Sequence, residues 1–219
     1  MRTVKINTSL STHLATAAAL FARNAYAVEQ ECTKASSEKL LTEHRSYCIG
    51  AVIASAAFLE ASINELYLEA IDRNPQTFGV IHQRLARLME HEWKTIESHP
   101  ILEKYQRALG LGLKSPFPQG EHVYQAVDAL VRLRNALVHY KPEWDTELKV
   151  HQHLEERLGT RFAHNPLADP NKAFIPYRCL GHGCAAWSVM TALEFYQKFT
   201  ERLGLPSRTI SDPAGLAVQ

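Results

Sequence analysis

The side chains best placed to do chemistry lie in the segment Arg134-Asn135-Ala136-Leu137-Val138-His139. On a helical wheel of about 100° per residue, Arg134 falls inside the broad apolar arc of a helix that the pattern predicts over residues 121–140. An arginine is charged at every physiological pH, and an isolated charge is very costly to bury. Arg134 therefore needs a carboxylate partner or must face a cleft.

A partner is available on the long helix predicted to begin at Ser36 or Ser37 and to end near Arg73. Glu60 lies within the apolar arc of that helix, and Asn64 lies one turn further along. The two glutamates expected on its opposite, solvated face are Glu65 and Glu69. We expect Glu60 to pair with the arginine, with Asn64 nearby. Two interpretations stay open, namely a polar pocket between two helices and an ion pair that fixes their register.

Polar side chains gather on the flank of the same predicted helix, at Asp128, Arg132, Asn135 and His139. Asn135 and His139 are four residues apart and share one face. Arg134 and His139 diverge by roughly 140° around the axis. They can meet at one small ligand only if the helix frays or a second subunit completes the pocket, which fits a site shared across a dimer interface. The alternative for His139 is a histidine that interacts with the last carbonyls of its helix.

These residues resemble a known motif. An Arg, four to six further residues and a His characterise the HEPN superfamily, and Arg134 and His139 have that spacing. Asn135 supplies the polar residue that follows the Arg, and Tyr140 resembles an aromatic near the motif in some members. The upstream segment 58–67 resembles the long helix of bacterial HEPN-like proteins. The resemblance covers roughly residues 40–144 and is weaker for the last helix.

The resemblance implies a dimeric helical bundle. Active members are metal-independent endoribonucleases of toxin–antitoxin, phage-defence and RNA-processing systems. It implies that His139 is a general base or acid at a ribose 2′-OH, that Arg134 stabilises the transition-state charge, and that Asn135 orients the phosphate or the imidazole. Products would carry a 2′,3′-cyclic phosphate. The residues in supporting positions are Glu60, Asn64, Arg132 and Tyr140. No metal and no cofactor is expected.

Other functions stay open, because some members of the superfamily are non-catalytic interaction or nucleotide-binding modules. In a third alternative, a separate transferase modifies Tyr140. The expected partners are a second copy of the chain, RNA, and an antitoxin or other operon partner, with no membrane. The net charge of +1 gives RNA little general attraction. A local patch could compensate, and its candidates are Arg73, Arg84, Arg87, Arg132 and Lys141.

The rest of the chain predicts an all-α fold, a bundle of long antiparallel helices with a C-terminal loop and an extra helix. The predicted helices cover residues 9–33, 36–73, 78–97, a short stretch after His99-Pro100, 121–140, 146–158 and 184–203. Residues 159–183 are expected to form a loop that is functional or draped over the helices. We expect one domain over 1–205, with a core at about 36–144, and a flexible tail over 206–219.

Composition is typical of a globular protein, with 46% hydrophobic and 21% charged residues among 219. Four cysteines are too few for a disulfide framework, which favours reduced thiols and a cytoplasmic location. The N-terminal segment 1–27 has helical spacing rather than the apolar core of a signal peptide. Cys179, His182 and Cys184 match no common zinc spacing, so metal binding there is the weaker interpretation.

Overall fold

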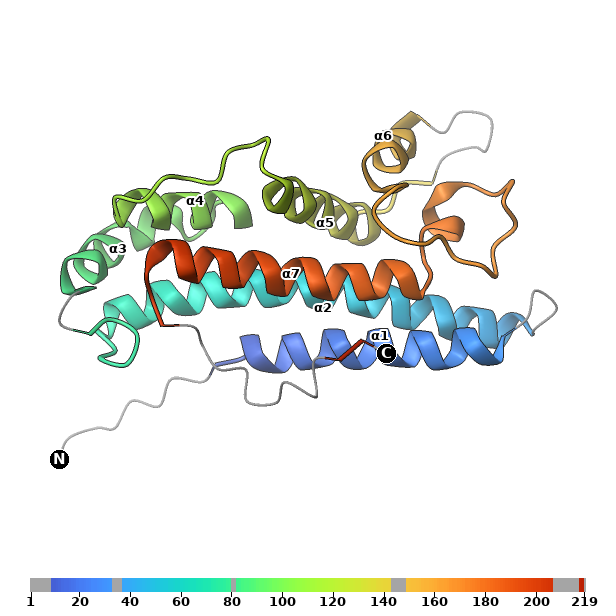
Figure 1. Ribbon diagram of the computed structural model, residues 1–219, viewed down its shortest axis with the longest axis horizontal. Helices are drawn as coiled ribbons and strands as arrows, with labels where there is room; N and C mark the ends of the chain where they lie inside the picture. Colours follow the sequence, from blue (N-terminus) through green and yellow to red (C-terminus); the bar gives the residue numbers. More distant parts are fainter. Residues whose placement is uncertain (1–8, 33–36, 80–81, 143–148, 207–216, 219) are drawn as a thin grey trace.

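The computed structural model describes residues 9–32, 37–79, 82–142, 149–206 and 217–218, and all regular elements within them are helical (Figure 1). This confirms the all-α fold class. The helices are α1 (Ser11–Glu31), α2 (Glu38–Ile71), α3 (Gln83–Ile96), α4 (Ile101–Leu111), α5 (His122–Val138), α6 (Lys149–Leu158), the five-residue π-helical turn η2 (Phe174–Arg178) and α7 (His182–Leu203).

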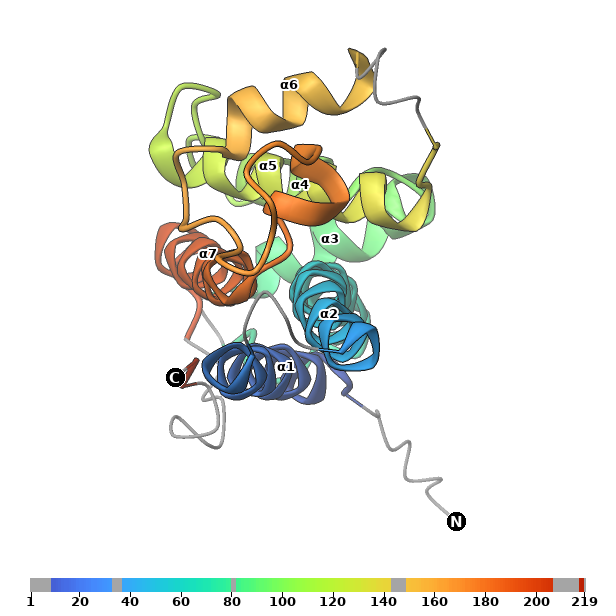
Figure 2. The same cartoon turned by 90° about the vertical axis from the view of Figure 1, so that its right-hand side faces the viewer.

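Three long helices, α1, α2 and α7, form a triangular three-helix bundle in which each helix packs against the other two along its length (Figures 1 and 2). The chain reverses between α1 and α2, so these two are antiparallel, whereas α7 runs in the same direction as α2. Small residues allow the close approach. A methyl group added at Gly50 of α2 would lie 3.0 Å from the Phe21 ring of α1. The buried alanines of α1 are Ala15, Ala18, Ala19, Ala22 and Ala25.

The remaining helices lie on the side of this bundle that α2 and α7 form, opposite α1 (Figure 2). Helices α3, α4 and α5 contact α2, and α4 and α5 also contact α7. Helix α5 crosses α2 and α7 obliquely, and α6 lies outermost, against α5 (Figure 2). Larger side chains fill the space between the three-helix bundle and the helices that cover it. The Tyr105 ring of α4, for example, meets Phe195 and Phe199 of α7 edge-on at centroid distances of 5.0 and 4.6 Å.

Most helix ends follow the local signals in the sequence. Ser37 is the residue that caps α2, and its hydroxyl accepts a hydrogen bond from the Leu40 N–H at 3.4 Å. Gly204 ends α7 with a φ of 78°, a left-handed conformation that glycine adopts without strain. The third helix begins at Gln83 rather than Phe78, because the preceding residues form turns. The first residues of the predicted sixth helix lie outside the described part.

The segment 159–183, predicted as a loop, contains η2 and packs against the start of α7. Its backbone runs close to the two glycines at that start. A methyl group on Gly181 would lie 2.7 Å from the Asn165 Cα, and one on Gly183 would overlap the Ala163 carbonyl oxygen. Glycine is therefore needed at both positions, because the backbone of the segment 159–183 approaches too closely for a Cβ atom.

Two further predictions concern the tail and the membrane. Of the predicted flexible tail, only residue 206 and residues 217–218 are described. Ala217 accepts a hydrogen bond from Arg23 at 2.7 Å, and the Val218 carbonyl lies 3.0 Å from His182 Nε2. Helix α2 contains an 18-residue window with a mean hydropathy of 1.6, long and apolar enough to cross a membrane. This is weak support for a membrane span, because 56% of that window is buried inside the molecule, as in a core helix.

Candidate functional site

Arg134 lies near the C-terminal end of α5, beside α2. Its Nη2 atom is 3.5 Å from the Glu60 Oε2 atom, so the expected pairing is present. The pair is more exposed than the position of Arg134 within an apolar arc predicted, because 23% of the Arg134 side chain and 44% of the Glu60 side chain are exposed. An ion pair this open to water stabilises a protein by at most about 1 kcal/mol. Glu60 therefore orients the guanidinium more than it stabilises the fold.

Asn64 bonds to a residue that the sequence analysis missed. The Lys104 Nζ atom of α4 donates a hydrogen bond to Asn64 Oδ1 at 2.9 Å. Lys104 is only 2% exposed. Burial lowers the pKa of Lys104, while the nearby carboxylates of Glu60 and Glu97 oppose that change. The polar cluster beside α5 thus contains two cations, the mostly buried Arg134 and the fully buried Lys104.

The wheel argument used for Arg134 would also have found Lys104. The buried side chains of α4 include Ile101, Leu102, Lys104, Tyr105, Ala108 and Leu109. Lys104 therefore lies inside the apolar arc of α4, as Arg134 does on α5. The sequence therefore carries the same signal for Lys104 as for Arg134, on a helix of only 11 residues.

The other two predicted catalytic residues lie on the solvent side of the end of α5. Asn135 and His139 are exposed, and His139 is the residue that ends the helix, with φ −108° and ψ 38°. The His139 N–H donates to the Asn135 carbonyl oxygen at 2.9 Å. Within the described residues, the His139 imidazole makes no hydrogen bond or ion pair, including none to the last carbonyls of α5. Tyr140 follows and is 43% exposed.

One chain does not bring the three predicted catalytic groups together. Arg134 contacts Glu60 on the α2 side of α5, whereas Asn135 and His139 face solvent. No hydrogen bond or ion pair joins Arg134 to His139 in the part of the chain that the structure describes. The divergence expected from the wheel therefore holds for the folded chain.

Arg132 belongs to a different cluster, between α5 and α6. Its Nε atom donates to Asp128 Oδ2 at 2.7 Å, and that hydrogen bond raises the pKa of Arg132. Arg157 of α6 approaches the same oxygen at 3.3 Å. The other members of the predicted local patch lie elsewhere. Arg73 pairs with Glu90 at 2.7 Å. Arg84 and Arg87 belong to α3, at the far end of the molecule from the end of α5 (Figure 1).

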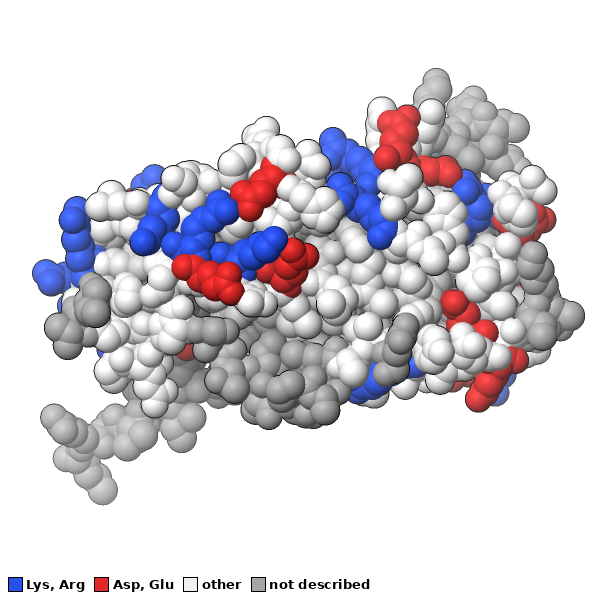
Figure 3. Space-filling model, in the orientation of Figure 1, with Lys and Arg blue, Asp and Glu red and all other residues white. Residues whose placement is uncertain are grey.

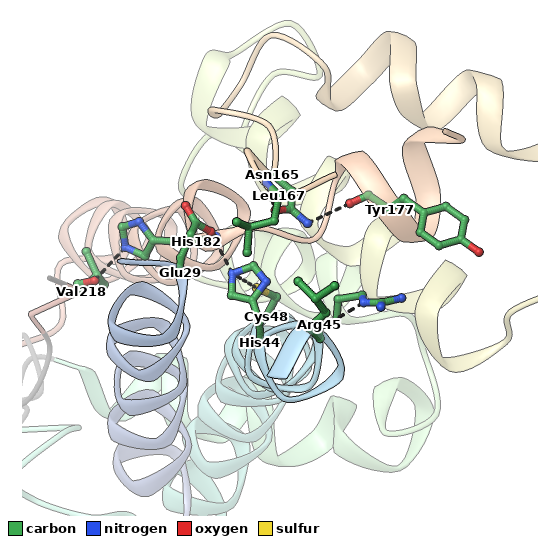
Figure 4. A network of polar contacts seen from close by, with 10 residues as sticks. Glu29, His44, Arg45, Cys48, Asn165, Leu167, Tyr177, His182 and Val218 are labelled. Atoms are coloured by element: carbon green, nitrogen blue, oxygen red, sulfur yellow. Dashed lines mark hydrogen bonds and ion pairs between the residues drawn. The ribbon is translucent and has the colours of Figure 1, made fainter. Parts of the chain in front are cut away.

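A buried polar network joins α1, α2 and α7 (Figure 4). His44 is 1% exposed, and its Nε2 atom lies 2.8 Å from Glu29 Oε2. The same carboxylate oxygen accepts the His182 N–H at the start of α7, at 2.8 Å. Burial alone would raise the pKa of Glu29, but the bonds from His44 and His182 hold it below its usual value. Every ionisable partner in the network is engaged, so we assign it to stability.

The described residues hold no group of three or more His, Cys, Asp or Glu side chains arranged to bind a metal ion. Cys179 and Cys184 are buried free thiols with their sulfur atoms 3.8 Å apart. The His182 ring that the sequence placed beside them bonds the Val218 carbonyl instead. The three side chains considered as a metal site in the sequence are therefore not gathered around one point.

Comparison of the chain with family models, with curated proteins and with solved structures gave no match. The assignment of a function thus depends on the geometry described above and on the resemblance of the Arg134–His139 segment to the HEPN motif.

Proposed function

We propose that the protein is an endoribonuclease of the HEPN type that acts as a homodimer. The observation that carries the proposal is the end of α5. There the exposed His139 has a ring free of hydrogen bonds and ion pairs within the described residues, and Asn135 lies on the same face. Arg134 lies alongside, its guanidinium directed by Glu60 at 3.5 Å. The uncommitted imidazole can accept a proton and the oriented guanidinium can stabilise negative charge, which are the two roles used in phosphodiester cleavage by the ribose 2′-hydroxyl.

In this reaction the ribose 2′-oxygen attacks the adjacent phosphorus. His139 takes the proton from the 2′-OH, the bond from phosphorus to the 5′-oxygen breaks, and the leaving 5′-oxygen takes a proton from water. The imidazolium then releases its proton to solvent. The products are a 2′,3′-cyclic phosphate and a 5′-hydroxyl. Arg134 stabilises the negative charge that builds up on the phosphate oxygens in the transition state. Asn135 orients the phosphate or the imidazole. The HEPN resemblance supplies the expectation that no metal is needed.

A second copy supplies what one chain lacks. Arg134 and His139 point to different sides of α5, so their convergence on one phosphate requires two α5 ends at a two-fold axis. Apolar side chains suited to such a contact are exposed at this end, since Val138 is 50% and Tyr140 43% exposed. A homodimer with a shared cleft follows. A toxin–antitoxin or phage-defence role, with a cognate partner protein in the cytoplasm, is the biological setting that the resemblance supports.

The direct test is cleavage of RNA in EDTA. Wild-type protein should cut single-stranded RNA and leave 2′,3′-cyclic phosphate ends. His139→Ala should lower the rate by at least about a hundredfold, the usual contribution of a positioned acid or base. His99→Ala is the matched control, because His99 is an exposed histidine at the start of α4 that pairs with Glu103. No cleavage by the wild type across varied RNAs would overturn the proposal.

The shared site can be tested by mixing two inactive variants. A dimer of one Arg134→Ala chain and one His139→Ala chain contains one site with both residues intact. Random reassociation should therefore restore about one quarter of wild-type activity, since half the dimers are mixed and each has one of two sites. A mixture as inactive as its components would place both residues in sites within single chains.

One observation favours a non-catalytic interaction or nucleotide-binding module instead. The pairs Arg134–Glu60 and Lys104–Asn64 join α5 and α4 to α2, which is what a purely structural cluster would do. On this alternative, Arg134→Ala lowers the melting temperature by several degrees and no variant changes RNA. An accepting role for Tyr140 would appear as added mass on the chain after co-expression with a transferase.

A further inference from the structure

A second charged cluster lies where α5 meets α6 and the segment after it. Three arginines from these elements, Arg132, Arg157 and Arg161, line a cavity of about 510 Å³. Figure 3 shows Lys and Arg side chains gathered on the surface where α5 and α6 meet. The other lining residues are Gln119, Tyr124, Gln125, Asp128 and Ala129. Their side chains include one carboxylate against three guanidinium groups.

The single carboxylate is divided between two of the arginines. Asp128 Oδ2 lies 2.7 Å from Arg132 Nε and 3.3 Å from Arg157 Nη1. Arg161 donates its Nε–H to the Arg157 carbonyl oxygen at 2.8 Å, and it has no ion pair among the residues that the structure describes. The lining residues thus carry two positive charges in excess.

Most of the guanidinium donors in the cavity remain available. Each guanidinium has five N–H groups, and the described contacts use one of Arg132, one of Arg157 and one of Arg161. Arg132 and Arg157 are each about half exposed, at 54% and 53% of their side chains. The donors can therefore reach a ligand from solvent without breaking the core.

We propose that this cavity binds a phosphate group of a polynucleotide or nucleotide ligand. Planar guanidinium forks match the paired oxygens of phosphate and remain charged at all physiological pH values. The neutral amides of Gln119 and Gln125 and the Tyr124 hydroxyl add donors without adding negative charge. The cavity volume also lies within the range of small-molecule sites.

The cavity residue Arg132 lies on the same face of α5 as His139 of the candidate active site. Arg132 and His139 are seven residues apart, which places them about 10 Å apart along the helix axis and about 20° apart around it. A strand with one phosphate in the cavity could present a nearby phosphodiester to His139. This extension to the RNA substrate rests on the proposed nuclease function, whereas phosphate binding in the cavity does not.

Binding is measured separately from cleavage by using full-length His139→Ala protein in EDTA. Anisotropy of a labelled single-stranded RNA reports the Kd, and the double variant with Arg161→Ala should raise that Kd about tenfold, the usual loss for a charged hydrogen bond. The slope of log K against log salt should fall by about 0.7, as expected for one lost phosphate contact with a single strand. Arg107→Ala is the matched control, because it removes an arginine of α4 whose side chain is 52% exposed and lies outside the cavity.

Two competitors, ATP and pyrophosphate, distinguish the sources of the phosphate. If ATP displaces the RNA, and if the affinity for ATP is also lost in Arg161→Ala, the ligand of the cavity is a free nucleotide. RNA binding that both competitors leave intact assigns a polynucleotide. The proposal is overturned if neither RNA nor ATP binds, or if Arg161→Ala behaves like Arg107→Ala. Thermal melting identifies any loss of RNA affinity that is caused by misfolding. The charge-preserving Arg161→Lys variant should retain part of that affinity.

The result is independent of the nuclease proposal. If the protein binds RNA through the cavity but never cuts it, the proposed function fails and the phosphate site stands. If the protein cuts RNA, Arg161→Ala should raise KM with little change in kcat, because Arg161 lies away from the reacting bond. His139→Ala should instead lower kcat.

Discussion

Two cations beside α2 show how differently the fold treats residues with the same sequence signature. Arg134 and Lys104 both interrupt the apolar arc of an amphipathic helix. Arg134 lies at the edge of the α5–α2 contact and keeps 23% of its side chain in water. Lys104 is 2% exposed and relies on Asn64 as its hydrogen-bond acceptor. A wheel identifies a residue that breaks the pattern, but the depth of its burial depends on the neighbouring helix.

Lys104 should make stability depend on alkaline pH. Burial lowers its pKa in the folded state below the value of about 10.4 for an unfolded chain. Between those two values the unfolded chain holds a proton that the folded chain has released, so the free energy of unfolding rises with pH there. In denaturant titrations from neutral pH to pH 10, wild type should gain stability relative to Lys104→Met.

The matched control is Lys198, whose pKa shift has the opposite sign. Lys198 is an exposed lysine of α7 whose hydrogen bond with Glu194 raises its pKa. Its contribution is complete below the unfolded pKa and is lost as pH rises through the folded one. The free energy of unfolding of Lys198→Met should therefore fall slightly less at high pH than that of the wild type. A wild-type curve parallel to that of Lys104→Met would show that Lys104 ionises as in water.

At the scale of elements, two long helices are capped by carboxylates from other helices. The first residue before α1 is Leu10, which cannot cap a helix with its side chain. Glu65 of α2 does so instead, accepting hydrogen bonds from the Leu10 and Ser11 N–H groups at 2.7 and 2.9 Å. It also accepts from the hydroxyls of Ser9 and Ser11. Glu29 of α1 has the same role at the start of α7 (Figure 4).

The prediction that Glu65 faces solvent was wrong for a physical reason. The wheel of α2 considered one apolar arc, as for a helix with one covered side. Helix α2 is instead central and contacts α1, α3, α4, α5 and α7. Glu65, only 9% exposed, faces α1, and the hydrogen bonds of the helix start replace the water that it loses.

Glu65→Gln should lower the free energy of unfolding by about 2 kcal/mol, because it weakens charge-assisted bonds at a helix N-terminus. Burial alone would raise the pKa of Glu65, but its bonds from Ser11, Leu10 and Ser9 hold it below its usual value. A depressed carboxylate pKa stabilises the fold above about pH 4, and this stabilisation is lost as pH falls through the folded value. Acid titration followed by circular dichroism should show that the stability of Glu65→Gln falls less with decreasing pH than the stability of the wild type.

Glu31→Gln serves as the comparison, since Glu31 is exposed at the last turn of α1. It should leave both the neutral-pH stability and the acid transition nearly unchanged. Equal effects of the two substitutions would rule out a capping role for Glu65.

At the scale of the whole molecule, the close packing of α1 against α2 and α7 sets the architecture. Alanines of α1 are buried where larger side chains would push the helices apart, and Ala22 is 0% exposed. Ala22→Leu should therefore lower the free energy of unfolding by about 1 to 3 kcal/mol through overpacking. Leu20→Ala should be nearly neutral, because Leu20 is 46% exposed. Urea unfolding of both variants tests this prediction. An unchanged free energy of unfolding in Ala22→Leu would indicate that α1 packs loosely against α2 and α7.

The sequence by itself determined the helical class, the approximate helix boundaries and the pairing of Arg134 with Glu60. These follow from apolar periodicity, from caps such as Ser37 and Gly204, and from the cost of an unpaired cation, all of which are local or nearly local. Only the tertiary structure decided how exposed that pair is. It also decided that Lys104 joins Asn64, that Glu65 caps α1, and that Arg132, Arg157 and Arg161 share a cavity. Such contacts depend on the crossing and rotation of whole helices, which no single helix encodes.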